Sequence, residues 1–421
     1  MAPRLQPVRG TRDLVGEELR RHRHVVETGR HLALRYGFEE IATPIFEFTE
    51  VFARTLGEAS DVVTKEMYTF ADRGGDSLTL RPEGTAAVVR AAISGGLLRA
   101  PPLKLFYQGP MFRYERPQKG RLRQFHQIGV EILGAGEPAA DVEAIVLGRH
   151  LLEELGVAAR TRLHLNTLGD PESRARYREA LVAHLEAHRH RLSADSLRRL
   201  ERNPLRVLDS KDPGDREVVA TAPVLVDFLS AGSRAFYAEV RARLADLGVP
   251  FVEDPHLVRG LDYYTHTTFE FLTEELGAQG AVVAGGRYDG LVRQMGGPDL
   301  PGVGWAAGVE RLAMLLSTSP PPPRPTALVP IGEAAEREAW RLALALRRAG
   351  FVVDLAYRGG PRPRMKRADR LGCRFALFLG EEELAAGTVK LRDLDSGAET
   401  ALPRARLSAE LERLGAARIR S

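Results

Sequence analysis

Glu83 and Thr85 are the first residues in this 421-residue sequence whose types and spacing could do chemistry. They follow Arg81 in an apolar stretch and come directly before a predicted helix over 86–92. This spacing puts a carboxylate and a hydroxyl at a helix N-terminus. The pair could bind a ligand, or it could be a helix cap, which contributes about 1 kcal/mol. The sequence alone leaves both interpretations open.

A second cluster over 112–131 has the pattern of two antiparallel strands joined by a polar, glycine-containing loop. Alternation puts Arg113 and Glu115 on one face, while the return strand presents Phe125, Gln127, Gly129 and Glu131 on one face. Charged groups are costly to bury without partners, so an anionic, polar ligand would explain them. A solvated sheet face is the alternative, although Phe125 and Gly129 favour a ligand platform.

Two further clusters combine arginine with glycine. Arg259 stands beside Gly260 and shortly before Tyr263 and Tyr264, which would let a guanidinium enter a tight site; a surface loop is the alternative. A glycine-rich run over 302–308 leads into a helix that carries Arg311. Such a run permits close approach to a planar ligand, on which arginine can stack. A packed helix with one snorkelling arginine is the alternative.

Several common sites are excluded. The sequence has no P-loop, no H-E-x-x-H and no G-x-S-x-G motif. The single cysteine, Cys373, excludes a disulfide framework and a cysteine-ligated zinc site, and its apolar neighbours indicate a core position. There is no apolar run near the roughly 20 residues of a membrane span and no signal core at the N-terminus. We therefore expect a cytoplasmic protein.

The secondary-structure elements that must position these residues are predicted to be of two kinds, a strand-rich region and a helical stretch that interrupts it. A long helix is predicted over 17–36, followed by short, alternating strands typical of an antiparallel sheet, at 77–80, 104–108, 112–114, 125–133, 267–272 and 282–284. The stretch 171–254 has a helical texture and interrupts the strands, so we interpret it as an inserted helical domain.

The proline run 320–325 predicts a linker, because it can continue neither a helix nor a sheet. Beyond it, strands are predicted at 326–331, 351–356, 375–379 and 388–394, with helices at 336–349 and 362–371, which indicates a small α/β domain. The net charge is +4 overall but +5 over 326–421, and the densest basic stretch is 358–370. That stretch could contact nucleic-acid phosphates or form a solvated helix face.

Together these motifs resemble class II aminoacyl-tRNA synthetases, and within them the histidyl-tRNA synthetase family, over essentially the whole chain. Residues 41–47 look like motif 1, 112–115 with Arg121 and Phe125 like motif 2, and 302–311 like motif 3. Narrower, histidine-specific elements are matched at 80–85, 257–264 and 284–289, and the family's insertion domain at 203–211.

The resemblance implies an α+β fold, with an antiparallel sheet flanked by helices, a helical insertion and a C-terminal α/β anticodon-binding domain. The catalytic domain would span 1–325, interrupted by the insertion at 171–254, and the anticodon-binding domain would span 326–421. Pro44 of motif 1 would lie at the interface of a homodimer.

The implied activity is the ATP-dependent ligation of L-histidine to tRNA(His) through a histidyl-adenylate. ATP would arrive with Mg²⁺, and no protein-bound structural metal is expected. The alternative is a non-catalytic relative, a regulatory subunit or a tRNA sensor. The retained C-terminal domain and the two arginines Arg113 and Arg259 favour the enzyme.

The resemblance also implies roles for individual residues. Arg113 and Arg259 would be catalytic, flanking the α-phosphate and the substrate carboxylate. ATP would be bound by Arg113, Glu115, Arg121, Phe125 and Arg311. Histidine would be bound by Glu83, Thr85, Arg113, Gln127, Glu131, Arg259, Tyr263, Tyr264 and Tyr288. The tRNA would be contacted by Arg116, Gln118, Arg364, Lys366 and Arg367.

Overall fold

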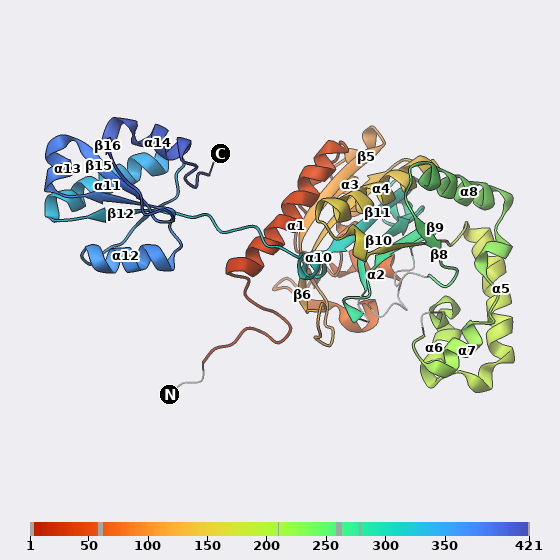
Figure 1. The fold of residues 1–421 in the computed structure, drawn as a ribbon. Coiled ribbons are helices and arrows are strands. Elements are labelled where there is room, and N and C mark those ends of the chain that lie inside the picture. The colour runs from red at the N-terminus through yellow and green to blue at the C-terminus, as the bar shows by residue number, and fades with distance from the viewer. Residues whose placement is uncertain (1–3, 58–61, 209, 258–262, 278–279, 420–421) are drawn as a thin grey trace. The chain divides into compact units, whose positions relative to one another are not determined.

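The computed structural model describes residues 4–57, 62–208, 210–257, 263–277 and 280–419 (Figure 1). The chain divides into two compact units, 1–320 and 321–421, and the division falls within the predicted proline linker. Each unit has its own sheet and its own apolar core.

An eight-stranded sheet forms the centre of the first unit, in the order β1-β5-β6-β11-β10-β9-β7-β8. Its strands are β1 (Glu39–Ile41), β5 (Leu103–Phe112), β6 (Gln124–Leu133), β7 (Arg162–Thr167), β8 (Phe251–Glu253), β9 (Thr265–Leu272), β10 (Ala281–Arg287) and β11 (Gly302–Gly308). The two edge pairs, β1 with β5 and β7 with β8, are parallel, and the other described pairs are antiparallel. The predicted antiparallel sheet is confirmed.

Four helices bury apolar faces against this sheet and share one core with it: α1 (Gly16–Arg35), α4 (Pro138–Glu154), α8 (Ala231–Asp246) and α10 (Val309–Leu315). The long predicted N-terminal helix is confirmed as α1, which buries Val25 and Leu32. Gly37 ends it at φ +77°, a left-handed conformation that glycine adopts without strain and that lets the amide of Phe38 reach the Ala33 carbonyl.

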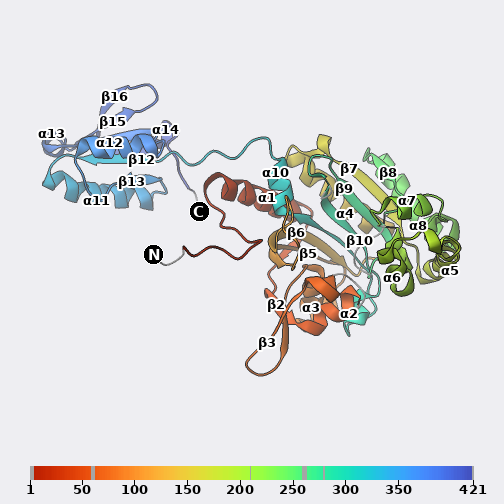
Figure 2. The same cartoon turned by 90° about the horizontal axis from the view of Figure 1, so that it is seen from below.

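A smaller sheet packs elsewhere in the first unit, in the order β2-β4-β3. It contains β2 (Phe46–Phe48), β3 (Tyr68–Ala71) and β4 (Ser77–Leu80). Figure 2 shows β2 and β3 near α2 (Thr49–Leu56) and α3 (Thr85–Ser94), and α9 (Leu291–Gln294) contacts these two helices. The predicted strand at 77–80 is confirmed as β4, but it belongs to this sheet rather than to the large one.

The predicted helical stretch 171–254 contains α5 (Pro171–Ala187), α6 (Ala194–Arg202) and α7 (Pro213–Val219). Asp170 and Asp212 cap α5 and α7 through side-chain bonds to first-turn amides. At the end of the stretch, α8 packs in the core of the large sheet and β8 pairs with β7. The bounds of the insertion domain stay a prediction.

The second unit has a five-stranded sheet in the order β13-β12-β14-β15-β16. Its strands are β12 (Thr326–Pro330), β13 (Val353–Leu355), β14 (Phe375–Leu379), β15 (Thr388–Asp393) and β16 (Glu399–Pro403), and its helices are α11 (Glu333–Arg348), α12 (Pro361–Arg370), α13 (Glu381–Ala386) and α14 (Leu407–Arg413). The strand–helix alternation is confirmed, and β12, β13 and β14 are parallel. The sequence did not predict β16, which forms an antiparallel hairpin with β15.

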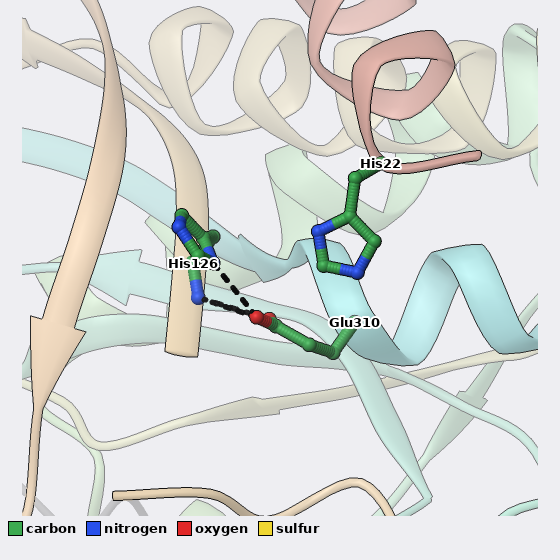
Figure 3. Close-up of side chains that lie close together, drawn as sticks. All are labelled: His22, His126 and Glu310. Atoms are coloured by element: carbon green, nitrogen blue, oxygen red, sulfur yellow. Dashed lines mark hydrogen bonds and ion pairs between the residues drawn. The ribbon is translucent and has the colours of Figure 1, made fainter. Parts of the chain in front are cut away.

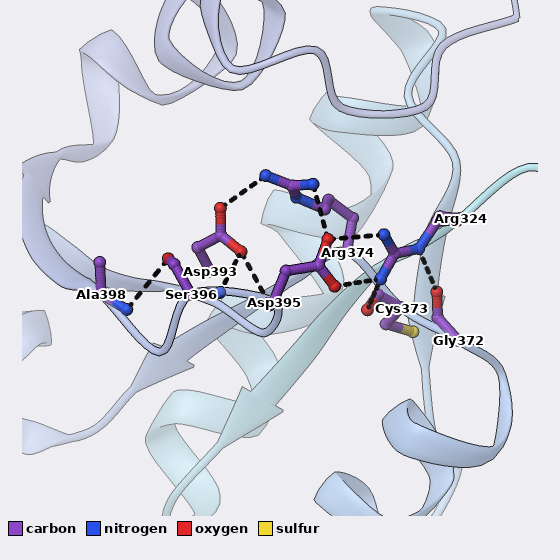
Figure 4. Close-up of polar contacts among 8 residues, drawn as sticks. All are labelled: Arg324, Gly372, Cys373, Arg374, Asp393, Asp395, Ser396 and Ala398. Atoms are coloured by element: carbon purple, nitrogen blue, oxygen red, sulfur yellow. Dashed lines mark hydrogen bonds and ion pairs between the residues drawn. The ribbon is translucent and has the colours of Figure 1, made fainter.

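A cluster of charged groups ties the start of this unit to the turn of the β15–β16 hairpin (Figure 4). Asp395 accepts from Arg324 Nη2 at 2.7 Å and from Arg374 Nη1 at 2.6 Å. Cys373, beside them, is buried, and burial raises the pKa of its thiol to about 11, as expected of a core cysteine.

Within the described ranges, no helix combines the length and the apolar character needed to cross a membrane.

Candidate active site

A cavity of about 270 Å³ lies over the large sheet, lined by residues of β6, β9, β10, β11, α10 and the loop between β5 and β6. All five residues predicted to bind ATP line it, together with Gln127: Arg113, Glu115, Arg121, Phe125 and Arg311. Residues nearly 200 positions apart in the sequence therefore meet at one concave site.

Arg311 forms one wall of the cavity. It donates from Nε to the Gly120 carbonyl at 3.1 Å and from Nη1 to the Ala281 carbonyl at 2.8 Å, which fixes the plane of the guanidinium. Burial lowers its pKa to about 10, and the positive charges of Arg113 and Arg121 act in the same direction. Three arginines share a small volume, which suits an anionic ligand with several phosphates.

Arg113 is held between the loop after β4 and the ring of Phe125. Its Nε donates to the Pro82 carbonyl at 2.9 Å, and its guanidinium carbon lies 5.4 Å from the Phe125 ring centre. Its Nη1 is 3.9 Å from Glu115 Oε1, and Arg121 pairs with the same carboxylate. The guanidinium of Arg113 is thus positioned at the side of the cavity nearest to Glu83.

Glu131 lies on the same strand and face as Phe125 and Gln127, and its side chain is fully buried. It accepts a hydrogen bond from Thr85 Oγ1 at 2.6 Å and another from the Tyr288 hydroxyl. Burial raises the pKa of Glu131 to about 8 against these two hydrogen bonds, and the charge of Glu83 adds to the rise. A carboxyl group whose pKa is shifted this far, beside a cavity, is a candidate for ligand recognition.

Glu83 is bound to the N-terminus of α3. Its carboxylate accepts from the amides of Thr85 at 2.7 Å and Ala86 at 2.9 Å, so it makes the hydrogen bonds of a helix cap. Burial raises its pKa, although these bonds oppose the rise. The hydroxyl of Thr85 donates instead to Glu131, so the two side chains of this motif have different partners.

Three tyrosines close the Glu131 side of the site. The ring centres of Tyr263 and Tyr264 are 4.7 Å apart, and those of Tyr263 and Tyr288 are 5.7 Å apart. Burial raises the pKa of Tyr263 and of Tyr288 well above the ordinary value, so both hydroxyls are protonated. Arg259, predicted to complete this group, lies outside the described residues.

The sequence interpretation did not connect Tyr107 or Gly304 with Glu131, yet both belong to this cluster. Tyr107 on β5 is buried, and burial together with the charges of Glu131 and Glu83 raises its pKa. A Cβ at Gly304 would come within 2.0 Å of Glu131 Oε2, so only glycine lets this carboxyl lie there. No local signal makes these connections, since cross-strand pairing places Gly304 opposite Glu131 and Tyr107 opposite Gly129, two residues before Glu131 on β6.

The residues predicted to contact tRNA fall into two groups. Arg116 and Gln118 are exposed in the loop between β5 and β6, and Lys366 is exposed on α12. Arg367 is half-buried and pairs with Asp354 at 2.8 Å. These positions are open to a large polyanion to different degrees.

Arg364, also predicted to contact tRNA, is buried in the second unit. It is only 4% exposed, and its guanidinium donates to the carbonyls of Gly359 and Ala356 and to Glu336. Its guanidinium is thus engaged within the domain, which does not favour the predicted contact with tRNA; that contact stays a prediction. Arg362 and Arg370, which the prediction omitted, are exposed beside Lys366 on the same helix and line one shallow depression with it.

Comparison with known proteins adds independent evidence. The model of the histidyl-tRNA synthetase family matches residues 10–312, and the model described as anticodon binding domain matches residues 326–414. The histidine–tRNA ligase of Rhodospirillum rubrum is 66% identical over 93% of this chain and 95% of its own length. The chain belongs to the histidyl-tRNA synthetase family.

Further relatives in this family match over most of the chain. The histidine–tRNA ligase of Gluconacetobacter diazotrophicus is 59% identical over 94% of this chain and 96% of its own length. The crystal structure of the apo histidyl-tRNA synthetase of S. aureus superposes with a TM-score of 0.81 at 37% identity, covering 97% of this chain and 99% of that one. The predicted family and fold class are therefore confirmed.

Proposed function

We propose that this chain ligates L-histidine to the 3′ end of tRNA(His), through a histidyl-adenylate and with release of pyrophosphate and AMP. Membership of the histidyl-tRNA synthetase family supports the reaction, and the retained arginines favour an enzyme over a regulatory relative. The observation that carries the choice of substrate is the buried Glu131, hydrogen-bonded by Thr85 and Tyr288 beside an arginine-lined cavity.

In the first step, the histidine carboxylate attacks the α-phosphorus of ATP and pyrophosphate leaves. Arg113, at the boundary between the cavity and the Glu83–Glu131 cluster, is suited to neutralise both the carboxylate and the α-phosphate. We assign the adenine to the space between Phe125 and Arg311, and the terminal phosphates to Arg121. Arg259 is assigned to the α-phosphate from its motif alone.

Mg²⁺ would arrive with the ATP phosphates and neutralise part of their charge. The cavity lining includes the carboxylates of Glu115 and Glu270, and oxygen is the ligand type that Mg²⁺ prefers. These two residues fit an ion that is held mainly by the nucleotide.

Glu131 and the tyrosines would recognise the imidazole of histidine. A carboxyl group can accept from one ring nitrogen, or donate when protonated, while the Tyr264 hydroxyl serves the other nitrogen. Glu83, Thr85 and Gln127 are proposed to bind the amino group. A site built on such buried hydrogen bonds rejects analogues that lack the imidazole by roughly 10⁴-fold, because its own groups would be left unpaired.

In the second step, a ribose hydroxyl at the tRNA 3′ end attacks the carbonyl carbon of the adenylate and AMP leaves. Arg116 and Gln118, exposed in the loop between β5 and β6, are proposed to contact the acceptor end. Lys366 and Arg367 on α12 are proposed to contact the anticodon stem-loop.

We also propose a homodimer whose interface includes the small sheet, in which β2 begins within motif 1. Phe46 and Phe48 of β2 and Phe70 of β3 are 49%, 54% and 45% exposed, so the small sheet presents apolar rings to solvent. Contiguous exposed apolar surface of this kind marks an interaction site.

The test is ATP–pyrophosphate exchange measured with each of the twenty amino acids. We expect exchange with histidine alone. Exchange driven by another amino acid would overturn the assigned specificity, and no exchange with any amino acid would favour the regulatory alternative. Charging of total tRNA with labelled histidine then tests the second step.

A further inference from the structure

Beside the cavity, three potential metal ligands from three distant elements meet: His22 of α1, His126 of β6 and Glu310 of α10 (Figure 3). One ligand atom of each lies within 4.8 Å of the other two. The roles proposed above for ATP, histidine and tRNA use none of these side chains.

His22 is the unexplained member. It is 4% exposed, and its Nε2 is fully buried without a hydrogen-bond partner among the described residues. A buried polar atom without a hydrogen bond costs about 1–3 kcal/mol of stability. A ligand bound to His22 Nε2 would explain why the protein tolerates this cost. Figure 3 shows the His22 imidazole near the Glu310 carboxylate, with no dashed line between the two side chains.

The other two residues are already joined. His126 Nδ1 lies 2.8 Å from Glu310 Oε1, and the His126 amide donates to the same carboxylate at 2.9 and 3.0 Å. The pair therefore already holds a carboxylate oxygen and an imidazole nitrogen close together, and both atom types ligate metal ions.

We propose that His22, His126 and Glu310 form a binding site for a transition-metal ion of the Zn²⁺ or Co²⁺ type. Two imidazole nitrogens and one carboxylate oxygen make a three-residue set that leaves a fourth position for water. Imidazole ligands favour these ions over Mg²⁺, so this site differs from the one for the nucleotide's magnesium.

The geometry requires a small closure. With metal–ligand distances of about 2.0–2.1 Å, tetrahedral ligand atoms lie roughly 3.3 Å apart, so the His22 ring must move inward by up to about 1.5 Å from the 4.8 Å limit. Nδ1 of His126 must also exchange its bond to Glu310 for the metal. The expectation of no protein-bound metal came from the family resemblance, and no sequence motif joins ligands from α1, β6 and α10.

The experiment is a titration of the full-length, chelator-treated protein with Co²⁺, followed by visible absorption, and with Zn²⁺, followed by calorimetry. We expect one saturable equivalent per chain with the absorption of tetrahedral Co²⁺, and a rise in Tm on saturation because the ion binds the folded state. His22→Gln should weaken binding at least ~10-fold, the scale of perturbing a metal's ligand shell.

His24→Gln, on the same helix two residues away, is the matched control and should bind as the wild type does. His184 and His188 are a second pair of neighbouring imidazoles, with ring centres 4.6 Å apart. Circular dichroism and Tm without metal check that His22→Gln folds, and His126→Asn removes a second ligand independently.

Absence of saturable Co²⁺ binding, an octahedral spectrum, or unchanged affinity in both variants would overturn the proposal. Exchange activity is not a readout here, so the result is independent of the proposed function.

Discussion

At the scale of single residues, the site depends on a carboxyl group that the fold makes difficult to ionise. Glu131 is fully buried, and two hydroxyl donors do not offset the lost hydration. The protein retains this group although a buried carboxyl disfavours its charged form. We interpret it as the recognition element for an imidazole, because the surrounding tyrosines remain protonated and can donate.

The raised pKa of Glu131, to about 8, predicts a pH dependence of stability. In the unfolded chain the carboxyl ionises near pH 4.5, whereas in the folded protein it holds its proton to about pH 8. Between these values the unfolded state binds fewer protons, so the free energy of unfolding should fall as pH rises. Relative to Glu131→Gln, the wild type should lose up to roughly 1.4 kcal/mol per pH unit.

Urea unfolding of both proteins at pH 5 and pH 8 measures this difference. Glu39→Gln, at an exposed position of β1, is the control for removing one carboxylate. A wild-type stability that is unchanged relative to Glu131→Gln across this range would mean that Glu131 ionises normally in the folded protein.

At the scale of elements, β10 is fastened to α4 beneath the site by a buried ion pair. Arg287 and Asp141 are both 0% exposed, with Nε and Oδ2 3.0 Å apart, and Arg287 also donates to the Ala135 carbonyl at 3.0 Å. Tyr288, which follows Arg287, is thereby held where its hydroxyl reaches Glu131.

Arg287→Met should reduce the free energy of unfolding by about 3–5 kcal/mol, because it leaves Asp141 buried without its partner. Arg293→Met is the matched control: its pair with Asp299 has both side chains more than 65% exposed, so less than about 1 kcal/mol is expected. Chemical denaturation measures both, and the double variant Arg287→Met/Asp141→Leu should be more stable than Arg287→Met. A double variant no more stable than Arg287→Met would argue against the uncompensated charge as the cause.

The exposed face of α12 carries a second prediction at this scale. Lys366→Ala and Arg370→Ala should each weaken tRNA binding and reduce the slope of log K against log salt by about 0.7–0.9 for each phosphate that the variant no longer neutralises. Arg337→Ala, at an exposed position of α11, should leave the slope unchanged. Filter binding at several salt concentrations gives the slopes. Equal slopes in all three variants would mean that the exposed face of α12 does not contact tRNA phosphates.

At the scale of the whole molecule, the positively charged part of the sequence coincides with the second of the two separately packed units. The +5 charge of 326–421 belongs to a unit whose core is built from its own residues, and among the described residues the cores of the first unit extend no further than Leu316. Separate cores permit separate folding, so the catalytic and tRNA-binding functions can be tested apart.

A chain ending at Pro320 should therefore keep histidine-dependent ATP–pyrophosphate exchange. Its kcat/KM for charging tRNA should fall by ~10²-fold or more, equivalent to about 2.7 kcal/mol of lost interaction energy. Exchange and charging assays on the same preparation measure both. Equal loss of the two activities would show that the second unit is needed for the first to fold or to act.

Local patterns in the sequence were sufficient to predict many of the strand faces and the boundary between the two units. Alternation in β6 put Phe125, Gln127 and Glu131 on one face, and the proline run marked the boundary between the two units. These features depend on the two-residue period of a strand and the fixed φ of proline, which are properties of short segments.

Tertiary structure alone decided which of these side chains are used within the protein and which remain available. Arg364 and Lys366 belong to the same basic helix, yet packing of α12 buries the first against carbonyls and leaves the second in solvent. Glu131 acquires its raised pKa from the loss of water, and its hydrogen bonds come from Thr85 and Tyr288, 46 and 157 residues away. Burial and long-range pairing are sums over many distant contacts, so no local pattern determines them.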